Sequence, residues 1–462
     1  MKLISNFSSF VKVLAGNTAL LNDVGTLGTS NLTLVLGNES ADLDSMVSSL
    51  TLAYVLSAQK NSSSVGNVVA VMNTNRADMV LRQDCQVLLQ SALLAEGGKG
   101  IEDLTFIDDI DLQAVVGRYS SDSNSNKKKE QEQEGIGRPA LDVWLVDHNA
   151  PASRQSFLED YVRGIVDHHV DEGKCQAAQW REIESVGSCS TLVAAKVRSL
   201  GNPVDPTLAK LMLAPVLLDT DNFSAASQRA TEKDRDIRSW LVPLVEWAPH
   251  ASSSSSSSLL EGAAGAGSSD AEGDDEAQSS GRELQVSSAQ ELYKTLDKLK
   301  GSVKHLASED LLRKDYKQWQ VADGAGKVWA VGISSVAYRM QKWLKRDGVG
   351  GVEDAVQAWI AKQGLDVALI MTHGKARPRK KQPKAYGRDL AVGFSQAGVS
   401  GLQESLLVRL LRESDTLGLQ SLHVDDLQSD MDRSRMLFFA QTRSESSRKQ
   451  VFPAVKHAIE SM

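Results

Sequence analysis

Residues 164–169 read Gly164-Ile165-Val166-Asp167-His168-His169, a short apolar run that ends in one aspartate and two adjacent histidines. A run of this kind between polar segments predicts a buried strand. Three other apolar runs predict strands followed by acidic residues: Leu32 to Gly37 before Asp42 and Asp44, Val143 to Val146 before Asp147, and Val216 to Leu218 before Asp219. Because the carboxyl ends of parallel strands share one edge of an open sheet, where such folds bind ligands, we expect the four segments to form one site.

The predicted site contains carboxylates and imidazoles but no matching set of cations in the same segments. Like charges held this close resist ionisation unless a counter-charge neutralises them, and a divalent metal supplies it. These ligands suit manganese, magnesium or cobalt, whereas a structural zinc site more usually recruits cysteine. Two ions about 3.5–4 Å apart can clamp both the attacking and the departing oxygen of a phosphoryl group. The pattern therefore predicts two divalent ions and the hydrolysis of a phosphoester or phosphoanhydride.

Each segment taken alone also has a simpler interpretation. Asp42 or Ser45 is explained as a cap of the helix predicted over Ser45 to Ser57. Residues 147–151 are explained as an Asx turn before proline, and the two histidines as surface or core residues. The order of all four segments, each behind a predicted strand, favours the metal site.

These segments and others downstream resemble the DHH-superfamily phosphoesterases. The resemblance is strongest to the fungal cytosolic exopolyphosphatases, which are similar to family II inorganic pyrophosphatases and to prune-type proteins. It extends from about Leu32 to Pro453, two low-complexity inserts excepted, and the matching stretches are residues 37–45, 166–169, 187–191, 217–220, 315–319 and 447–450 with Pro453. Six matches in the same order make the resemblance specific.

The resemblance implies five metal ligands in the first half of the chain. Asp42 and Asp147 would hold one ion, and Asp147 would bridge to a second ion held by Asp44, His168 and Asp219. Loss of Asp147 would therefore affect both ions.

The resemblance also implies the groups that contact substrate. His169 would touch the substrate phosphate and act as an acid toward the leaving group. Lys317 and Arg448 would hold phosphate from the second half of the chain, with Lys449 and Arg313 nearby. Arginine suits bidentate recognition of oxygen, and lysine acts as a point charge. Without the resemblance, any one of these basic residues is explained as part of a solvated helix face.

Asn38 departs from the pyrophosphatase pattern, which has a histidine ligand at this position. An amide oxygen in place of imidazole favours magnesium over manganese, and the same asparagine resembles the exopolyphosphatase pattern. It argues against a manganese pyrophosphatase, and we expect Asn38 to contact substrate. His148 and Asn149 are predicted to support the ligands from behind. Cys189 is predicted to be a small packed residue, not a nucleophile, because no base partner is evident.

Strand-like and helix-like stretches alternate along the first half, which predicts an α/β fold with a doubly wound, mainly parallel sheet. We expect this metal-binding domain at residues 1–247, a Ser/Gly/acidic linker at 248–289, and a smaller α/β substrate-binding domain at 290–462. The active site is expected in the cleft between them. Two low-complexity stretches are interpreted as a surface loop at residues 119–137 and as a tether that contains seven consecutive serines at residues 251–281.

Composition limits the remaining possibilities. A chain of 462 residues fits two domains, and its net charge of −8 says little about the substrate because much of the acid lies in the linker. Cys85, Cys175 and Cys189 show no metal-binding spacing, which predicts a reducing compartment. No run approaches the roughly 20 apolar residues of a membrane span, so no membrane association is expected. Cytoplasm is the expected location.

The N-terminal segment lacks acidic residues, so a mitochondrial targeting segment is the alternative interpretation of it. An amphipathic helix over Phe7 to Leu14 that packs on the sheet is the simpler explanation of that segment.

The sequence thus predicts a monomeric exopolyphosphatase that releases orthophosphate from the end of linear polyphosphate. The alternatives are an inorganic pyrophosphatase, a prune-like nucleotide phosphodiesterase or short-chain polyphosphatase, and a prune-like interaction protein without activity. The five intact ligands argue against an interaction protein without activity.

The densest basic run, residues 375–384, could steer a polyanion, act as a nuclear signal or be only an exposed loop. It lacks interleaved aromatic residues, so nucleic acid is not the expected ligand.

Overall fold

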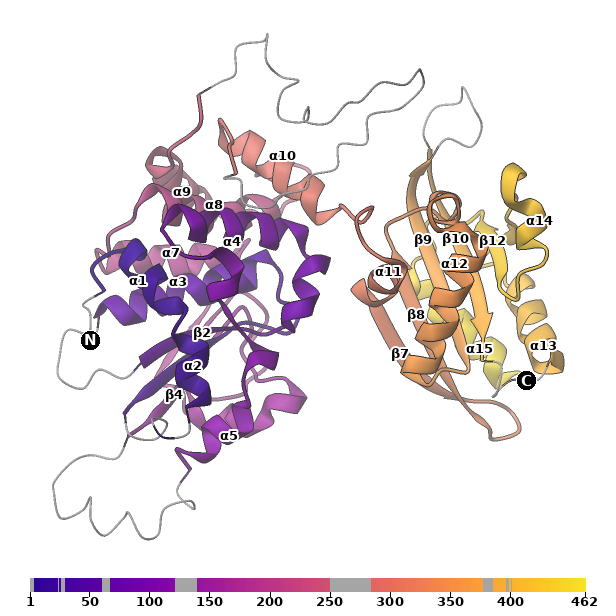
Figure 1. Ribbon diagram of the computed structural model, residues 1–462, viewed down its shortest axis with the longest axis horizontal. Coiled ribbons are helices and arrows are strands. Elements are labelled where there is room, and N and C mark those ends of the chain that lie inside the picture. The colour runs from indigo at the N-terminus through magenta and orange to yellow at the C-terminus, as the bar shows by residue number, and fades with distance from the viewer. Residues whose placement is uncertain are drawn as a thin grey trace. The chain divides into compact units, whose positions relative to one another are not determined.

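The computed structural model describes residues 4–23, 25, 30–59, 67–120, 139–249, 284–376, 385–395, 399 and 401–462 (Figure 1). The chain divides into two units, Met1–Lys300 and Gly301–Met462. Most of the predicted surface loop at 119–137, most of the expected linker and residues 377–384 of the basic run lie outside the described residues.

The first unit is built on a six-stranded sheet in which all neighbouring strands are parallel, in the order β3-β2-β1-β4-β5-β6. The strands are β1 (Leu32–Leu36), β2 (Asn67–Met72), β3 (Thr105–Phe106), β4 (Leu141–Val146), β5 (Val162–Asp167) and β6 (Trp180–Ile183). All residues of β1 are buried, as expected for a central strand covered on both faces. The predicted parallel α/β sheet is confirmed.

Helices cover both faces of this sheet (Figure 1). One face carries α1 (Phe7–Leu14), α3 (Leu43–Gln59), α4 (Gln83–Ala95), α7 (Cys189–Ser199), α8 (Pro206–Asp219), α9 (Glu232–Leu241) and α10 (Ala289–Lys300), and the other carries α2 (Asn17–Asn22) and α5 (Leu112–Gly117). Short 3-10 helices are η1 (Arg76–Leu81), η2 (Gly100–Asp103), η3 (Ile107–Asp109), η5 (Ser153–Tyr161) and η6 (Val242–Leu244). The predicted helix at Phe7 to Leu14 is present, and its Phe7 ring lies 5.7 Å from the ring of Tyr54 on α3.

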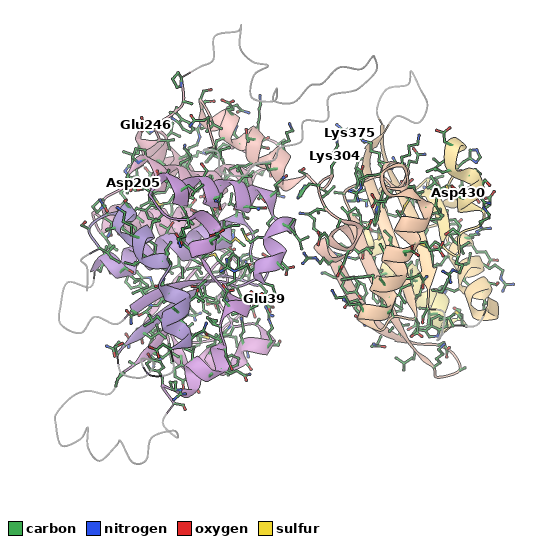
Figure 2. The ribbon with its side chains drawn as sticks, in the orientation of Figure 1. Glu39, Asp205, Glu246, Lys304, Lys375 and Asp430 are labelled. Atoms are coloured by element: carbon green, nitrogen blue, oxygen red, sulfur yellow. The ribbon has the colours of Figure 1, made fainter. Side chains whose placement is uncertain are left out.

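One predicted strand is wrong, because Val216 to Leu218 form the last turn of helix α8. Asp205, labelled in Figure 2, caps this helix by accepting a hydrogen bond from Leu208 N at 2.8 Å, and Pro206 occupies its first turn. Ten of its residues between Leu208 and Leu218 are buried, so the helix has no polar face in that region. A short apolar run does not distinguish a buried strand from a buried helix. Asp219 therefore ends a helix.

Helix α10 and the residues before it pack on the first unit. Ala248 N donates to Val286 O at 2.9 Å, and Leu284 N donates to Ser91 Oγ at 2.6 Å. The residues on either side of 250–283, which lie outside the described residues, are thus both attached to the first unit. The boundary between the units falls after Lys300, whereas the sequence placed residues 290–300 in the second domain.

The second unit contains a mixed six-stranded sheet in the order β11-β12-β10-β9-β8-β7, in which only β8 and β9 pair in parallel. The strands are β7 (Tyr316–Ala322), β8 (Val328–Val336), β9 (Val367–Ala376), β10 (Ala385–Phe394), β11 (Leu419–Ser421) and β12 (Leu437–Gln441). The helices are α11 (Ser308–Lys314), α12 (Met340–Gln363), α13 (Gly401–Arg412), α14 (Gln428–Met431) and α15 (Arg448–Glu460), with the 3-10 helix η7 (Asp425–Leu427). The second α/β domain is confirmed.

Two findings bear on the cellular expectations. The three cysteines are unpaired and buried. None of the helices in the described part of the chain has the length and apolarity that crossing a bilayer needs.

Candidate functional site

A cavity of about 290 Å³ lies in the first unit beyond the carboxyl ends of β1, β4 and β5. Its lining brings together all five predicted metal ligands, Asn38 and His169. The full set is Asn38, Ser40, Asp42, Asp44, Asp147, His168, His169, Gly187, Asp219 and Arg229. Carboxylates dominate this lining, as the strand-end pattern predicted.

Asp147 occupies a strained position in the middle of this lining. Its φ of 62° lies in the left-handed region, which non-glycine residues seldom adopt and which often marks functional sites. Asn38 Nδ2 donates to Asp147 Oδ2 at 2.7 Å, while Asp147 Oδ1 is buried without a hydrogen bond. The nearest imidazole nitrogen, His168 Nε2, lies 3.2 Å from Oδ1. A buried carboxylate oxygen without a donor is costly, which fits an oxygen that binds a cation.

Asp219 has the same property, because its Oδ2 atom is also buried and makes no hydrogen bond. Burial, together with the charges of Asp44 and Asp42, raises the pKa of Asp219 to about 8. Burial together with Asp44 raises the pKa of Asp147 to about 7. The lining thus contains carboxyl groups that resist ionisation until a positive charge joins them.

His168 is oriented as a ligand histidine usually is. Its Nδ1 lies 3.0 Å from Val186 O, and its Nε2 lies near Asp147 Oδ1 and 3.8 Å from Asp44 Oδ2. Burial lowers the pKa of His168, but Asp147 and Asp44 outweigh it and raise the value to about 10. A backbone carbonyl that fixes one ring nitrogen while the other faces carboxylates matches a metal ligand with outer support.

Asp42 and Asp44 each accept hydrogen bonds at the start of a helix, so the cap interpretation given for Asp42 holds. Asp44 accepts hydrogen bonds at the start of α7 from Ser188 Oγ at 2.7 Å and Cys189 N at 2.6 Å. Asp42 Oδ1 accepts from Ser45 N at 3.2 Å, at the start of α3. Each carboxylate has about four lone-pair positions and keeps capacity for a cation.

Asp167, which the sequence reasoning did not assign to the site, holds His169 in place. Asp167 is fully buried, and its Oδ1 lies 2.8 Å from His169 Nδ1. The side chain of His169 is 56% exposed. The hydrogen bond with Asp167 and its charge raise the pKa of His169, although burial opposes them. Asn149 Nδ2 donates to Asp167 Oδ2 at 2.6 Å, in keeping with its expected supporting role.

Asn38 and His148 make contacts near the cavity that the sequence did not predict, and Arg229 is an additional lining residue. Asn38 Oδ1 accepts from Ala41 N at 3.0 Å within its own loop, and the neighbouring Glu39 is labelled in Figure 2. His148 Nδ1 lies 2.9 Å from Val146 O, and its Nε2 is buried without a hydrogen bond. Arg229 lines the cavity as an exposed cation. No sequence signal distinguished this arginine, because it follows the helix end without a motif.

A metal ion has ready ligands in this cavity. Asp147, His168 and His169 offer one ligand atom each within 4.8 Å of one another. His169 is the least suitable of the three, because its Nδ1 already bonds to Asp167. Asp219 Oδ2, buried and unpaired, adds an oxygen to the cavity lining.

The predicted phosphate-binding residues lie in the second unit. Lys317, Arg448 and Lys449 line a cavity of about 460 Å³, and its other residues are Asp315, Trp319, Ser335, His373, Arg388, Ser447, Phe452 and Pro453. Arg448 Nη2 donates to Asp315 Oδ1 at 2.5 Å. Arg313 is not part of this lining, and its side chain lies 2.8 Å from Asp310 one turn earlier in α11.

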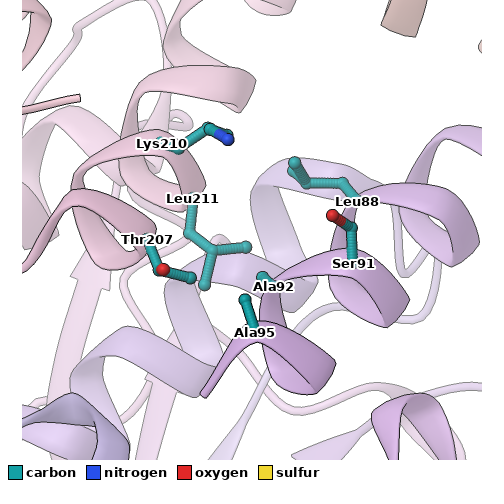
Figure 3. Close-up of a pocket in the computed structure, with 7 residues that line it drawn as sticks. All are labelled: Leu88, Ser91, Ala92, Ala95, Thr207, Lys210 and Leu211. Carbon is teal, nitrogen blue, oxygen red and sulfur yellow. The ribbon is translucent and has the colours of Figure 1, made fainter. Parts of the chain in front are cut away.

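A third cavity shows what an ordinary gap between helices looks like here. It lies between α4 and α8 and measures about 20 Å³ (Figure 3). Small and apolar side chains such as Ala92 and Leu211 form much of it, and Lys210 is its one charged residue. This volume suits about one water molecule, so we assign it no ligand.

Two family models match the chain, one within the first unit and one mainly within the second. Residues 33–216 match the N-terminal domain of the DHH family, and residues 294–458 match the DHHA2 domain. A Schizosaccharomyces pombe protein named "Putative exopolyphosphatase" is 26% identical over 458 residues, which cover 95% of this chain and 94% of that protein.

Two further relatives match over shorter regions. "Exopolyphosphatase PRUNE1" of Rattus norvegicus is 28% identical over 69% of this chain, and the match spans about half of that relative's length, 55%. A "Probable manganese-dependent inorganic pyrophosphatase" of Deinococcus radiodurans is 36% identical over 105 residues, 22% of this chain and 33% of that protein.

Proposed function

We infer that the chain belongs to the DHH phosphoesterase family and is a hydrolase, because a DHH domain is followed by a DHHA2 domain and a relative matched over most of its length is named an exopolyphosphatase. From that premise we propose that it is an exopolyphosphatase, which hydrolyses the terminal phosphoanhydride of linear polyphosphate and releases orthophosphate. The observation that carries this proposal is the pair of buried carboxylate oxygens without a hydrogen bond, Asp147 Oδ1 and Asp219 Oδ2, with His168 Nε2 3.2 Å from the first. The relative from Schizosaccharomyces pombe, matched over nearly its whole length, supports the substrate class.

Two divalent cations, magnesium or manganese and also cobalt, are the proposed cofactors. Asp42, Asp44, Asp147, His168 and Asp219 would hold them, with Asp147 shared. When bound, the ions would neutralise the carboxylates, activate the attacking water and polarise the phosphoryl oxygens. The raised pKa values of Asp147 and Asp219 support this assignment, because these groups need a neighbouring positive charge to ionise at neutral pH.

His169 is the proposed acid for the leaving group. Its Nδ1 is committed to Asp167, so Nε2 is the nitrogen that remains for substrate. The raised pKa of His169 favours the protonated form, which can donate to the oxygen that departs from phosphorus. Asp167 in turn stabilises the imidazolium and sets the orientation of the ring.

Lys317, Arg448 and Lys449 are the proposed phosphate-binding residues of the DHHA2 domain. A metal centre neutralises one or two phosphates, whereas a chain of phosphates needs positive charge along its length. Among these residues, Arg448 has a planar guanidinium suited to paired oxygens, although it shares its charge with Asp315. Asn38 is proposed to contact substrate at the other cavity. The three unpaired cysteines support the cytoplasm as the proposed location.

Orthophosphate release by the purified protein tests the proposal. Pyrophosphate, triphosphate and long-chain polyphosphate would each be assayed with magnesium, manganese or cobalt. We expect release from triphosphate and long chains, and little from pyrophosphate. Preference for pyrophosphate would favour the pyrophosphatase alternative, which the Deinococcus relative supports over 22% of the chain. No release under any metal would contradict the proposal and favour an interaction protein.

A further inference from the structure

One face of the second sheet changes from apolar to polar along an oblique line that crosses four neighbouring strands. Lys317 on β7, Ser335 on β8, His373 on β9 and Arg388 on β10 mark this line. In the ladder His373 pairs with Arg388, and Ser335 N donates to Asp315 O at 2.9 Å. The residues two positions inward on β8, β9 and β10 are buried in the core: Ile333, Met371 and Leu390. The apolar part of this face therefore ends where the cavity begins.

Helix α15 packs on the apolar part of the same face and begins at the polar line. Its Val451, Val455 and Ile459 belong to the core, whereas Ser447, Arg448 and Lys449 at its start line the cavity. Ser447 caps the helix and accepts a hydrogen bond from Lys449 N. The first turn of a helix carries a partial positive charge. The helix and the strands thus contribute positive charge to the same cavity.

The charges that line this cavity do not balance. Four of its residues are permanent or near-permanent cations at neutral pH: Lys317, Arg388, Arg448 and Lys449. Asp315 is the only carboxylate in the lining, and Arg448 already contacts it through both Asp315 O at 2.9 Å and Asp315 Oδ1. Burial and Arg388 lower the pKa of His373, with Asp315 acting in the opposite direction, so this imidazole is neutral near pH 7 and can donate one hydrogen bond. The excess of positive charge fits an anionic ligand.

Arg388 is held in a way that leaves its outer nitrogens available. Its Nε donates to Ser444 O at 2.7 Å, and its guanidinium carbon lies 5.7 Å from the centre of the Tyr386 ring. No described residue accepts a hydrogen bond from its two terminal nitrogens. A guanidinium fixed at one nitrogen and open at the other two is suited to phosphate oxygens.

We propose that His373 and Arg388 form a distal phosphate subsite, which holds the part of a linear polyphosphate chain beyond the phosphates bound by Lys317 and Arg448. This inference rests on the proposed function and adds a determinant of chain length. The line from β7 to β10 crosses three strand intervals of about 4.8 Å and so spans roughly 14 Å or more. A diphosphate is two tetrahedra that share one oxygen, and it is far too short to span this distance. An extended chain of several phosphates can do so.

Arg388→Gln in the full chain tests the subsite. We expect KM for long-chain polyphosphate to rise about tenfold, with kcat for both substrates and KM for triphosphate within about twofold, because only the longer chain reaches Arg388. Arg388→Lys should keep most of the affinity for long chains. Arg433→Gln is the matched control, because this arginine is 74% exposed, pairs with Asp430 and lies outside the cavity.

A binding measurement separates this inference from the proposed activity. The thermal shift caused by long-chain polyphosphate in EDTA should be smaller for Arg388→Gln and for His373→Gln than for the parent chain. If the parent hydrolyses no polyphosphate but these variants still lose binding, the subsite stands and the proposed function fails. Equal effects on triphosphate and long chains, or no effect at all, would overturn the subsite. If Arg388→Gln fails to fold, His373→Gln decides, because no hydrogen bond joins the His373 side chain to the described residues.

Discussion

The carboxylate-lined cavity of the first unit and the cation-lined cavity of the second unit have opposite charges, and their side chains are held differently. In the first unit, Asp147 and Asp219 are mostly buried, have unpaired oxygens and have raised pKa values. In the second unit, Lys317 and Lys449 are exposed, and four cations face a single carboxylate. Cations that enter the first cavity would therefore favour the ionised form of its carboxyl groups, whereas the second cavity is charged before any ligand binds. Buried like charges and exposed like charges have different consequences because solvent screens only the second set.

Removing a carboxylate from the cavity of the first unit is expected to have the largest effect on turnover. Asp147→Asn should lower kcat by about a thousandfold or more, roughly 4 kcal/mol of transition-state stabilisation, because both proposed ions lose a shared ligand. The thermal midpoint should stay equal or rise, since one repelling carboxylate is gone. Orthophosphate release and a thermal melt check both expectations.

A matched control comes from β4, the strand that ends just before Asp147. Asp142 lies on β4 and pairs with Arg163 on the sheet surface, outside the cavity. Asp142→Asn should leave kcat within about twofold. Near-normal turnover of Asp147→Asn would contradict the bridging role and remove the contrast between the two cavities.

Removing a cation from the cavity of the second unit is expected to have a smaller effect, and mainly on KM. Lys317→Gln should raise KM for triphosphate about tenfold with a smaller change in kcat, because one cation of several is lost. The increase should shrink at high salt, where exposed charges are screened. Lys345→Gln is the control, since Lys345 pairs with Asp426 and does not line the cavity. A large fall in kcat with unchanged KM would show that Lys317 acts at the reacting phosphate.

The pH dependence of stability sharpens the comparison further. The folded-state pKa values of Asp147 (about 7) and Asp219 (about 8) exceed the ordinary 3.8, so the metal-free fold binds more protons than the unfolded chain. The free energy of unfolding therefore falls as pH rises from about 5 to about 8. His168, raised from 6.5 to about 10, adds to the fall above about pH 6.5.

Thermal melts in EDTA should show this loss as a midpoint about 3 °C or more lower at pH 8.5 than at pH 5.5. Saturating divalent metal should abolish it, because bound cations replace the protons. Asp219→Asn should flatten the metal-free profile. A midpoint that rises with pH in EDTA would contradict the raised pKa values of Asp147 and Asp219.

The smallest effect is expected from the insert between residues 249 and 284. Ala248 N bonds to Val286 O, so a short glycine and serine connection can replace residues 250–283 without moving α10. The midpoint and kcat should change little, within about 2 °C and twofold, because the residues on either side of the insert stay attached to the first unit. A large loss of activity would show that the insert contributes to one of the two cavities.

The sequence predicted the elements whose apolar runs are long or strictly bounded. The strand at Leu32 to Leu36 and the helix over Ser45 to Ser57 are present where expected. It failed at α8, because residues that are apolar all round a helix resemble those of a buried strand. It also missed β6, whose four residues include none that is buried. In both cases the sequence pattern that identifies a helix or strand depends on a difference between its apolar face and its polar face, and α8 and β6 lack that difference.

The site shows the same division. Acidic residues behind strands identified the five proposed ligands, because local order along the chain fixes which residues follow a strand. Asp167 was quoted in the motif but received no role, and Arg229 was not found at all. Their positions depend on how His169 turns and on how the loop after α8 folds back, which neighbouring residues in the chain do not specify.

By itself the sequence determined the ligand chemistry, because carboxylates and imidazoles after apolar runs are encoded residue by residue. Tertiary structure decided which oxygens lack donors, that Asp219 arrives from a helix, and that His373 and Arg388 lie beside Lys317 and Arg448. These facts depend on packing between segments distant in the chain. Burial and pairing are properties of such packing, and no local pattern contains them.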